Sequence, residues 1–313
     1  MKLVTSTGDF SGYVNTVEEK IRHFKGSKFK YINLEQTGTI PEFLSDDDDG
    51  WKRLAEAWGN AGKDAGVEFL VSHSPCLNAY QELTDENYAV VVRAIRRSIE
   101  IAHVLSIPRI VVHACPHESF TAAEFYRENK RFYNDLLDLA EKYNIALLTE
   151  NMDNYMHHPL STGKELREFA DYMDHPLLGV CWDIAHGNIN QKAKRLGQYE
   201  NITAIGDKLW GLHVSDNFGD SAHHHSWPFA GIVNFDSVMQ GLLDVNYDGH
   251  FTFEASYTLL HEQNIPYHRQ AWEHNGETVT RLLSPPVELK KQAVDLLYNI
   301  GEYILKTYDC FEE

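Results

Sequence analysis

Short apolar stretches rich in β-branched residues alternate with longer amphipathic stretches along the whole chain. Eight of the short stretches have the length and composition of strands that are buried on both faces. The longer stretches between them are typical of helices that pack one face on a core. The predicted strands span 2–6, 30–35, 67–73, 109–114, 145–151, 177–183, 209–216 and 250–256, and the clearest predicted helices span 51–65, 84–105, 122–143 and 286–307.

Regular alternation of strand and helix predicts a parallel sheet. Eight such units favour a closed (β/α)8 TIM barrel over an open sheet. The 313 residues of the chain suffice for the about 250 that a barrel needs, with some left for insertions. No linker rich in Gly, Pro or Ser interrupts the sequence, so we expect one domain over residues 1–313.

Two segments fall outside the strand–helix repeat. The acidic stretch 45–50 is interpreted as the solvated start of a helix. The segment from about 257 to 285 follows the eighth strand, and loops of this length inside a compact domain are usually functional. We expect this insertion to lie over the barrel mouth or at a subunit contact of a homo-oligomer.

Composition narrows the range of partners. Lys and Arg number 28 against 46 Asp and Glu, a formal net charge of -18, which disfavours nucleic acid and anionic membranes as partners. No apolar run approaches the roughly 18 residues of a membrane span, and the N-terminus does not resemble a signal peptide. The four cysteines have no paired spacing. We therefore expect a cytoplasmic protein that acts on a small molecule.

Polar side chains able to bind a metal stand at the ends of six consecutive predicted strands, 30 to 41 residues apart. The carboxyl ends of barrel strands are where such folds build active sites. One histidine or carboxylate alone is more often a hydrogen-bonded core residue or a helix cap. Three carboxylates in one barrel mouth, however, would repel each other without a cation. The sequence therefore predicts a metal site among His73, His113, Glu150, Asp183, His213 and Glu254.

The expected core of this site consists of three carboxylates and one imidazole. Such a ligand set is hard and mostly oxygen, and it suits Mn²⁺ first, with Mg²⁺, Co²⁺ or Zn²⁺ as alternatives. The four ligands would be Glu150, Asp183, His213 and Glu254.

The stretch CWDIAHGN at 181–188 allows two interpretations. Asp183 could cap a helix that carries a surface histidine, or Asp183 and His186 could both stand at the metal site. In the second interpretation His186 lies on the loop above the metal. Further on, His223 and His225 would face the same side of an extended segment. These two histidines are therefore candidates for binding additional metal or substrate, as are His73 and His113.

These residues resemble the xylose-isomerase-like TIM barrel family, which contains sugar and sugar-phosphate isomerases and epimerases together with endonuclease IV. The resemblance runs from VSHSP, at the third predicted strand, to FTFEAS, at the eighth. It includes the metal quartet, the D-x-x-H motif at Asp183 and His186, and a match over 223–235. This chain departs from the last segment at three positions, with His223 in place of Asp, Phe229 in place of Gly and Asn234 in place of Asp.

The resemblance implies a divalent-metal-dependent sugar isomerase or epimerase that removes a proton beside a carbonyl, through a metal-bound enediolate. Glu150 and Glu254 would be the catalytic acid and base. His186 would hold a substrate hydroxyl or move its proton. Trp227 and Phe10 are the expected contacts to the sugar.

Three alternatives stay open. The first is a trinuclear zinc phosphodiesterase like endonuclease IV, although the acidic stretch 45–50 and the overall charge oppose DNA binding. The second is a metal-dependent lyase or dehydratase of keto-sugars from the same family. The third is a non-catalytic barrel with a structural metal, against which the complete quartet argues. The nuclease's nine ligand positions carry His73, His113, Glu150, Asp183, His186, His213, His223, His225 and Glu254.

Overall fold

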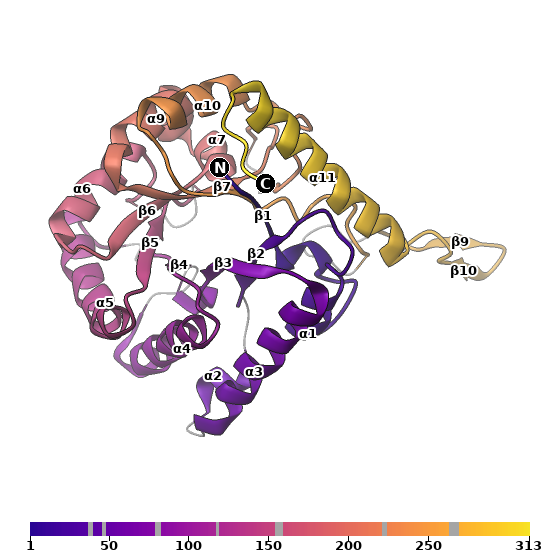
Figure 1. Ribbon diagram of the computed structural model, residues 1–313, viewed down its shortest axis with the longest axis horizontal. Helices are drawn as coiled ribbons and strands as arrows, with labels where there is room; N and C mark the ends of the chain where they lie inside the picture. The colour runs from indigo at the N-terminus through magenta and orange to yellow at the C-terminus, as the bar shows by residue number, and fades with distance from the viewer. Residues whose placement is uncertain are drawn as a thin grey trace.

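The computed structural model describes residues 1–36, 40–45, 48–78, 83–116, 119–153, 159–220, 224–262 and 269–313. Eight parallel strands close into a barrel in the order of the chain, with the helices around it (Figure 1). The predicted (β/α)8 TIM barrel is therefore confirmed. The strands are β1 (Leu3–Ser6), β2 (Tyr31–Glu35), β3 (Glu68–His73), β4 (Arg109–Val111), β5 (Ala146–Glu150), β6 (Leu178–Asp183), β7 (Leu209–Val214) and β8 (Phe251–Phe253).

Most of the long helices begin at a capping box, in which a threonine and the residue three positions later satisfy each other's backbone N–H groups. Thr84, Thr121 and Thr162 start three of them in this way. Among the described residues, no helix has both the length and the apolar composition of a membrane span. The helices are α1 (Val17–Arg22), α2 (Pro41–Leu44), α3 (Asp48–Ala65), α4 (Asp85–Val104), α5 (Ala122–Tyr143), α6 (Gly163–Met173), α7 (Ile184–Ile189), α8 (Gln191–Leu196), α9 (Gln198–Ile205), α10 (Phe235–Asp244) and α11 (Val287–Thr307).

The barrel interior is filled by a small apolar layer that is separate from the larger core between strands and helices. This layer contains Val4, Val71, Val111, Leu148 and Cys181. Space there is tight, because a Cβ added at Gly211 would lie 2.6 Å from Leu148 Cδ1. Side chains alternate between the two faces of a strand. The residues two positions further along therefore also face the interior, and these include most of the predicted metal ligands.

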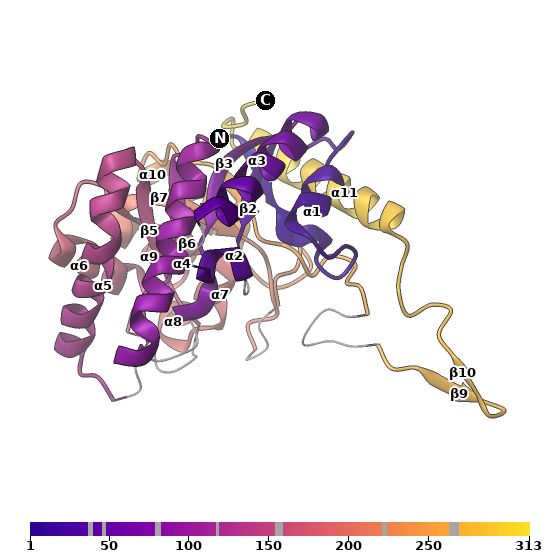
Figure 2. The same ribbon diagram turned by 90° about the horizontal axis from the view of Figure 1, so that it is seen from below.

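The insertion after β8 has two distinct parts. Its first residues lie at the barrel mouth, where the Tyr257 backbone N–H donates to the His225 carbonyl at 2.9 Å. Its later part forms an antiparallel hairpin of β9 (Trp272–His274) and β10 (Glu277–Val279). Both views show this hairpin beyond the ring of helices, so it does not cover the mouth of its own barrel (Figures 1 and 2). Residues 263–268 lie outside the described part, and a subunit contact stays a prediction.

The acidic stretch 45–50 leads directly into a helix. The helix α3 begins at Asp48, three residues before the predicted start. Residues 46–47 lie outside the described part of the chain.

Candidate metal centre at the barrel mouth

Glu150, the last residue of β5, is at the centre of the predicted constellation. Its Oε2 atom lies 3.0 Å from His113 Nε2 and 3.5 Å from His73 Nε2. Its Oε1 atom lies 2.9 Å from His213 Nδ1. Glu150 is fully buried, so this carboxylate bridges histidines from three other strand ends away from bulk water.

The predicted quartet comes together on the other side of Glu150. His213 Nδ1 lies 3.3 Å from Glu254 Oε2 and 4.0 Å from Asp183 Oδ2. One ligand atom from each of the four residues lies within 4.8 Å of those of the others. Asp183 Oδ2 is buried and has no hydrogen-bond partner among the described residues, a costly state that a cation would relieve. The ligand atoms of one octahedral ion lie about 3 Å apart, so this set fits a divalent metal after small adjustments.

The structure agrees with part of each interpretation of the stretch CWDIAHGN, the helix cap and the metal site. Asp183 is the N-cap of α7, because its Oδ1 atom accepts from the His186 backbone N–H at 2.7 Å. His186 is not a surface residue, since only 4% of it is exposed. We predicted that His186 would lie on a loop. It lies instead in the first turn of α7. One oxygen of Asp183 thus caps a helix, and the other is available as a candidate metal ligand.

Three of the histidines are held by the same kind of backbone contact. The Nδ1–H groups of His73, His186 and His225 donate to the carbonyls of Ser74, Asn151 and Glu254, at 2.9, 2.9 and 3.0 Å. A donor bond of this kind fixes the tautomer and makes Nε2 the acceptor atom of the neutral ring. Histidines that bind metals are usually oriented in this way.

The ligand-capable residues form three adjoining groups. Besides the quartet, they are the groups of Asp183, His186 and His225, and of His73, Cys76 and His113. Asp183 belongs to two of the groups, and Glu150 contacts the histidines of the third. Eight of the nine positions implied by the nuclease resemblance thus lie together, whereas His223 lies outside the described residues.

The two glutamates differ in their affinity for protons. Burial raises the pKa of Glu254 to about 7; His213 opposes this rise, while Glu150 and Asp183 add to it. Burial also disfavours the ionised form of Glu150, but His213, His113 and His73 together hold its pKa well below the usual range. Two carboxylates with separated pKa values in one site are what acid and base chemistry requires.

The two predicted sugar contacts are placed differently. Phe10 is 1% exposed, and its ring packs against Phe24 and His23 at centroid distances of 5.0 and 5.3 Å. Core packing therefore explains Phe10 better than the substrate contact that we predicted. Trp227 is partly buried at the edge of the outer core, and its contact with a substrate stays a prediction.

The polar ends of β1 and β2 were not predicted as part of the site, because the series of candidate metal ligands begins at the third predicted strand. Ser6 and Glu35 end these strands, and the Ser6 hydroxyl donates to the Glu35 carboxylate. Asn33 is fully buried, and its side-chain amide has no hydrogen-bond partner among the described residues. The period-two alternation of side chains along a strand would have placed these residues on the interior face.

Comparison with known proteins identifies the class to which this barrel belongs. The family model described as xylose isomerase-like TIM barrel matches residues 24–275. The chain therefore belongs to the xylose isomerase-like TIM barrel family, as the resemblance implied.

Individual relatives are distant. The uncharacterized protein MJ1311 of Methanocaldococcus jannaschii is 28% identical over 189 residues, which are 59% of this chain and 64% of that protein. The L-ribulose 3-epimerase of a Methylomonas species is 24% identical over 157 residues, 50% of this chain and 51% of the enzyme. The chain thus matches between about half and two thirds of the length of these relatives. A solved structure of a D-tagatose 3-epimerase-like protein has a TM-score of 0.69 and 22% identity, covering 99% of this chain and 98% of its own.

Proposed function

We propose that this protein is a metal-dependent sugar isomerase or epimerase that moves a proton at a carbon beside a carbonyl group. The observation that carries the proposal is the placement of Glu150 and Glu254 around His213, at 2.9 and 3.3 Å from the same Nδ1 atom. The L-ribulose 3-epimerase and the D-tagatose 3-epimerase-like protein support it as relatives. Mn²⁺ is our first choice of metal because the quartet is hard and rich in oxygen.

Each residue of the site has a distinct task in this proposal. A divalent ion held by the quartet would polarise the substrate carbonyl. Glu150 and Glu254, which lie 2.9 and 3.3 Å from His213 Nδ1, would be the acid and base, one removing a proton and the other returning one. His186, whose Nδ1–H donates to the Asn151 carbonyl, would hold a substrate hydroxyl or move its proton. The unsatisfied amide of Asn33 is suited to bind another hydroxyl of the sugar.

The proposal is tested by turnover of a panel of ketopentoses, ketohexoses and 3-keto-glycosides, each with and without a phosphate group. We expect at least one of them to be converted into an epimer or isomer when Mn²⁺ is present, and not after chelation. The Glu254→Gln protein should be inactive with this substrate. Glu168→Gln, an exposed change in α6, is the matched control and should retain activity. No conversion of any member with Mn²⁺, Mg²⁺, Co²⁺ or Zn²⁺ would contradict the proposal.

One observation favours a second candidate function. The three adjoining ligand groups are the arrangement expected for a trinuclear zinc phosphodiesterase like endonuclease IV. The net charge of -18 opposes this candidate, because DNA binding depends on neutralising phosphates. Cleavage of an oligonucleotide with an abasic site, in the absence of sugar turnover, would establish the nuclease instead. A keto-sugar lyase or dehydratase would be recognised in the same panel by loss of water or of a leaving group.

A further inference from the structure

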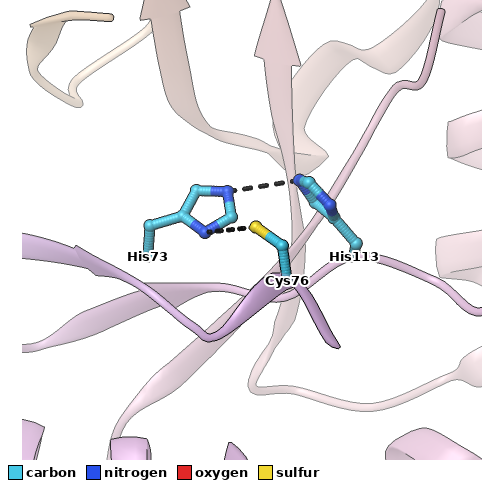
Figure 3. Close-up of side chains that lie close together, drawn as sticks. All are labelled: His73, Cys76 and His113. Carbon is cyan, nitrogen blue, oxygen red and sulfur yellow. Dashed lines mark hydrogen bonds between the residues drawn. The ribbon is translucent and has the colours of Figure 1, made fainter. Parts of the chain in front are cut away.

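Two buried residues of opposite charge lie outside the groups of candidate metal ligands. The group at the ends of β3 and β4 belongs to the metal centre: His73 and His113 meet through their Nε2 atoms, and the Cys76 sulfur lies on the other side of the His73 ring (Figure 3). The separate pair consists of Asp9, in the 3₁₀ turn that follows β1, and Lys290, in the first turn of α11. Only 2% of Asp9 and 1% of Lys290 is exposed.

We propose that Lys290 is a positioning residue for Glu254, and that it acts through the short turn that follows β8. The Lys290 ammonium donates to the Ser256 carbonyl at 3.2 Å and to the Thr258 carbonyl. Within the turn, the hydroxyl and the backbone N–H of Thr258 both donate to the Ala255 carbonyl, at 2.9 and 3.2 Å. Lys290 therefore holds a turn that begins at the residue directly after Glu254.

The same turn is connected to a second residue of the metal centre. The Tyr257 backbone N–H donates to the His225 carbonyl at 2.9 Å, and the His225 Nδ1–H donates to the Glu254 carbonyl at 3.0 Å. On its other side, the Glu254 backbone N–H donates to the Val214 carbonyl of β7 at 3.1 Å. The sheet thus holds Glu254 from one side, and the turn bound by Lys290 holds it from the other. If this turn moved, Glu254 and His225 would move with it.

The chemistry of the position supports a specific task for the lysine. A buried ammonium is costly unless it is hydrogen-bonded and its charge is offset. The two carbonyls supply the hydrogen bonds, and Asp9 supplies the negative charge: burial lowers the pKa of Lys290 to about 8, and Asp9 opposes this lowering. One Asp9 oxygen accepts from the Thr5 hydroxyl at 2.5 Å, and the other has no hydrogen-bond partner among the described residues. An apolar side chain would be sufficient to pack the start of α11 on the barrel, so the buried charge points to the carbonyl contacts as its task.

The inference rests on the proposed function in one respect, because it takes Glu254 to be a metal ligand and an acid or base. Loss of the two carbonyl contacts should leave every candidate ligand in the chain but displace Glu254. Residues that support metal ligands typically contribute about 10-fold to 100-fold to metal affinity or activity. We therefore expect weaker Mn²⁺ binding and a lower kcat at nearly unchanged KM when Lys290 is replaced.

Two variants and one control separate positioning from folding. Lys290→Met keeps the apolar stem and loses both hydrogen bonds, but it leaves Asp9 buried without its counter-charge. The double variant Asp9→Asn with Lys290→Met removes that uncompensated charge as well, and it should recover most of the stability that Lys290→Met loses. Lys306→Met removes an exposed positive charge from the same helix and is the matched control.

The first measurement is hydrogen exchange in the metal-free proteins. The Tyr257 amide should exchange at least about 10-fold faster in both Lys290 variants than in the parent, because the turn that holds it opens more readily. In Lys306→Met it should exchange as in the parent. The second measurement is a Mn²⁺ titration followed by electron paramagnetic resonance. The double variant should bind Mn²⁺ about 10-fold more weakly than the parent and the control.

The proposal is overturned if the double variant keeps the parent exchange rate at Tyr257 and the parent affinity for Mn²⁺, because Lys290 would then only pack α11. It is also overturned if the double variant recovers both the stability and the kcat of the parent. If none of the proteins converts a sugar, the proposed function fails, but the exchange and Mn²⁺ measurements still decide the task of Lys290.

Discussion

Asp183 performs two tasks that a pair of substitutions can separate. Its Oδ1 atom caps α7, and its Oδ2 atom lies 4.0 Å from His213 Nδ1, within the group of residues proposed to hold the metal. Asparagine is as good an N-cap as aspartate, but its amide nitrogen cannot bind a cation. Asp183→Asn should therefore keep the cap and lose the metal, whereas Asp183→Ala should lose both.

The expected magnitudes follow from these two tasks. At a metal concentration 100 times Kd, binding stabilises the parent protein by about 2.7 kcal/mol. If Asp183→Asn weakens binding about 100-fold, the same concentration contributes only about 0.4 kcal/mol. Without metal, this variant should be at least as stable as the parent, because a buried charge beside Glu150 is removed. Asp183→Ala should be less stable than Asp183→Asn by about 1 kcal/mol, the usual contribution of a cap.

Denaturant unfolding with and without Mn²⁺ measures the stabilisation by metal of the parent and of Asp183→Asn, and the metal-free stability of both variants. The metal content of the purified proteins shows which of them bind the ion. The reasoning is refuted if Asp183→Asn is stabilised by Mn²⁺ as much as the parent protein. Equal metal-free stability of the two variants would show that the cap contributes little.

Three further predictions concern other parts of the molecule. If the group around His186 holds an ion, His225→Ala should bind fewer metal equivalents than the parent; an unchanged content would leave His225 as a substrate contact. Burial raises the pKa of Asp9 to about 6, against the opposing effects of Lys290 and Thr5. Because this pKa lies above the unfolded value, Asp9 lowers stability as the pH rises from about 4 to 6, by up to about 3 kcal/mol. Asp9→Asn should flatten this part of the curve of unfolding free energy against pH, and an unaltered slope would contradict the assignment. Replacing residues 270–281, which include the 62% exposed Trp272, by a short Gly-Ser linker should reduce oligomer mass in light scattering and impair turnover more than it lowers Tm. Unchanged mass and turnover would show that the hairpin contributes neither to oligomer formation nor to activity.

The barrel and the convergence of the ligand-capable residues at its mouth could be predicted from the sequence because both depend on simple repeats. The strands β5 and β6 have clear apolar runs that end in Glu150 and Asp183. Once eight parallel strands close, their carboxyl ends meet by geometry, so residues far apart in the sequence, such as His73 and Glu150, become neighbours.

Features that depend on local backbone geometry were not predictable in the same way. Phe10 follows the first strand just as a pocket residue would, but the 3₁₀ turn η1 (Thr7–Phe10) directs it into the core. Cys76 stands in a loop with no periodic pattern, and only the turn after Pro75 brings its sulfur near His73. The direction of the hairpin after β8 likewise depends on the path of an irregular segment.

The central claim, metal-dependent proton removal beside a carbonyl, is tested most directly by solvent deuterium exchange. The Mn²⁺-loaded protein is incubated with ketoses and 3-keto-glycosides in D₂O, and the recovered sugars are analysed by NMR and mass spectrometry. We predict that deuterium enters one sugar at a single carbon next to the carbonyl, that chelation stops the exchange, and that Glu150→Gln and Glu254→Gln each abolish it. Conversion of a sugar without any deuterium entering from solvent, or exchange that persists in both variants, would contradict this account.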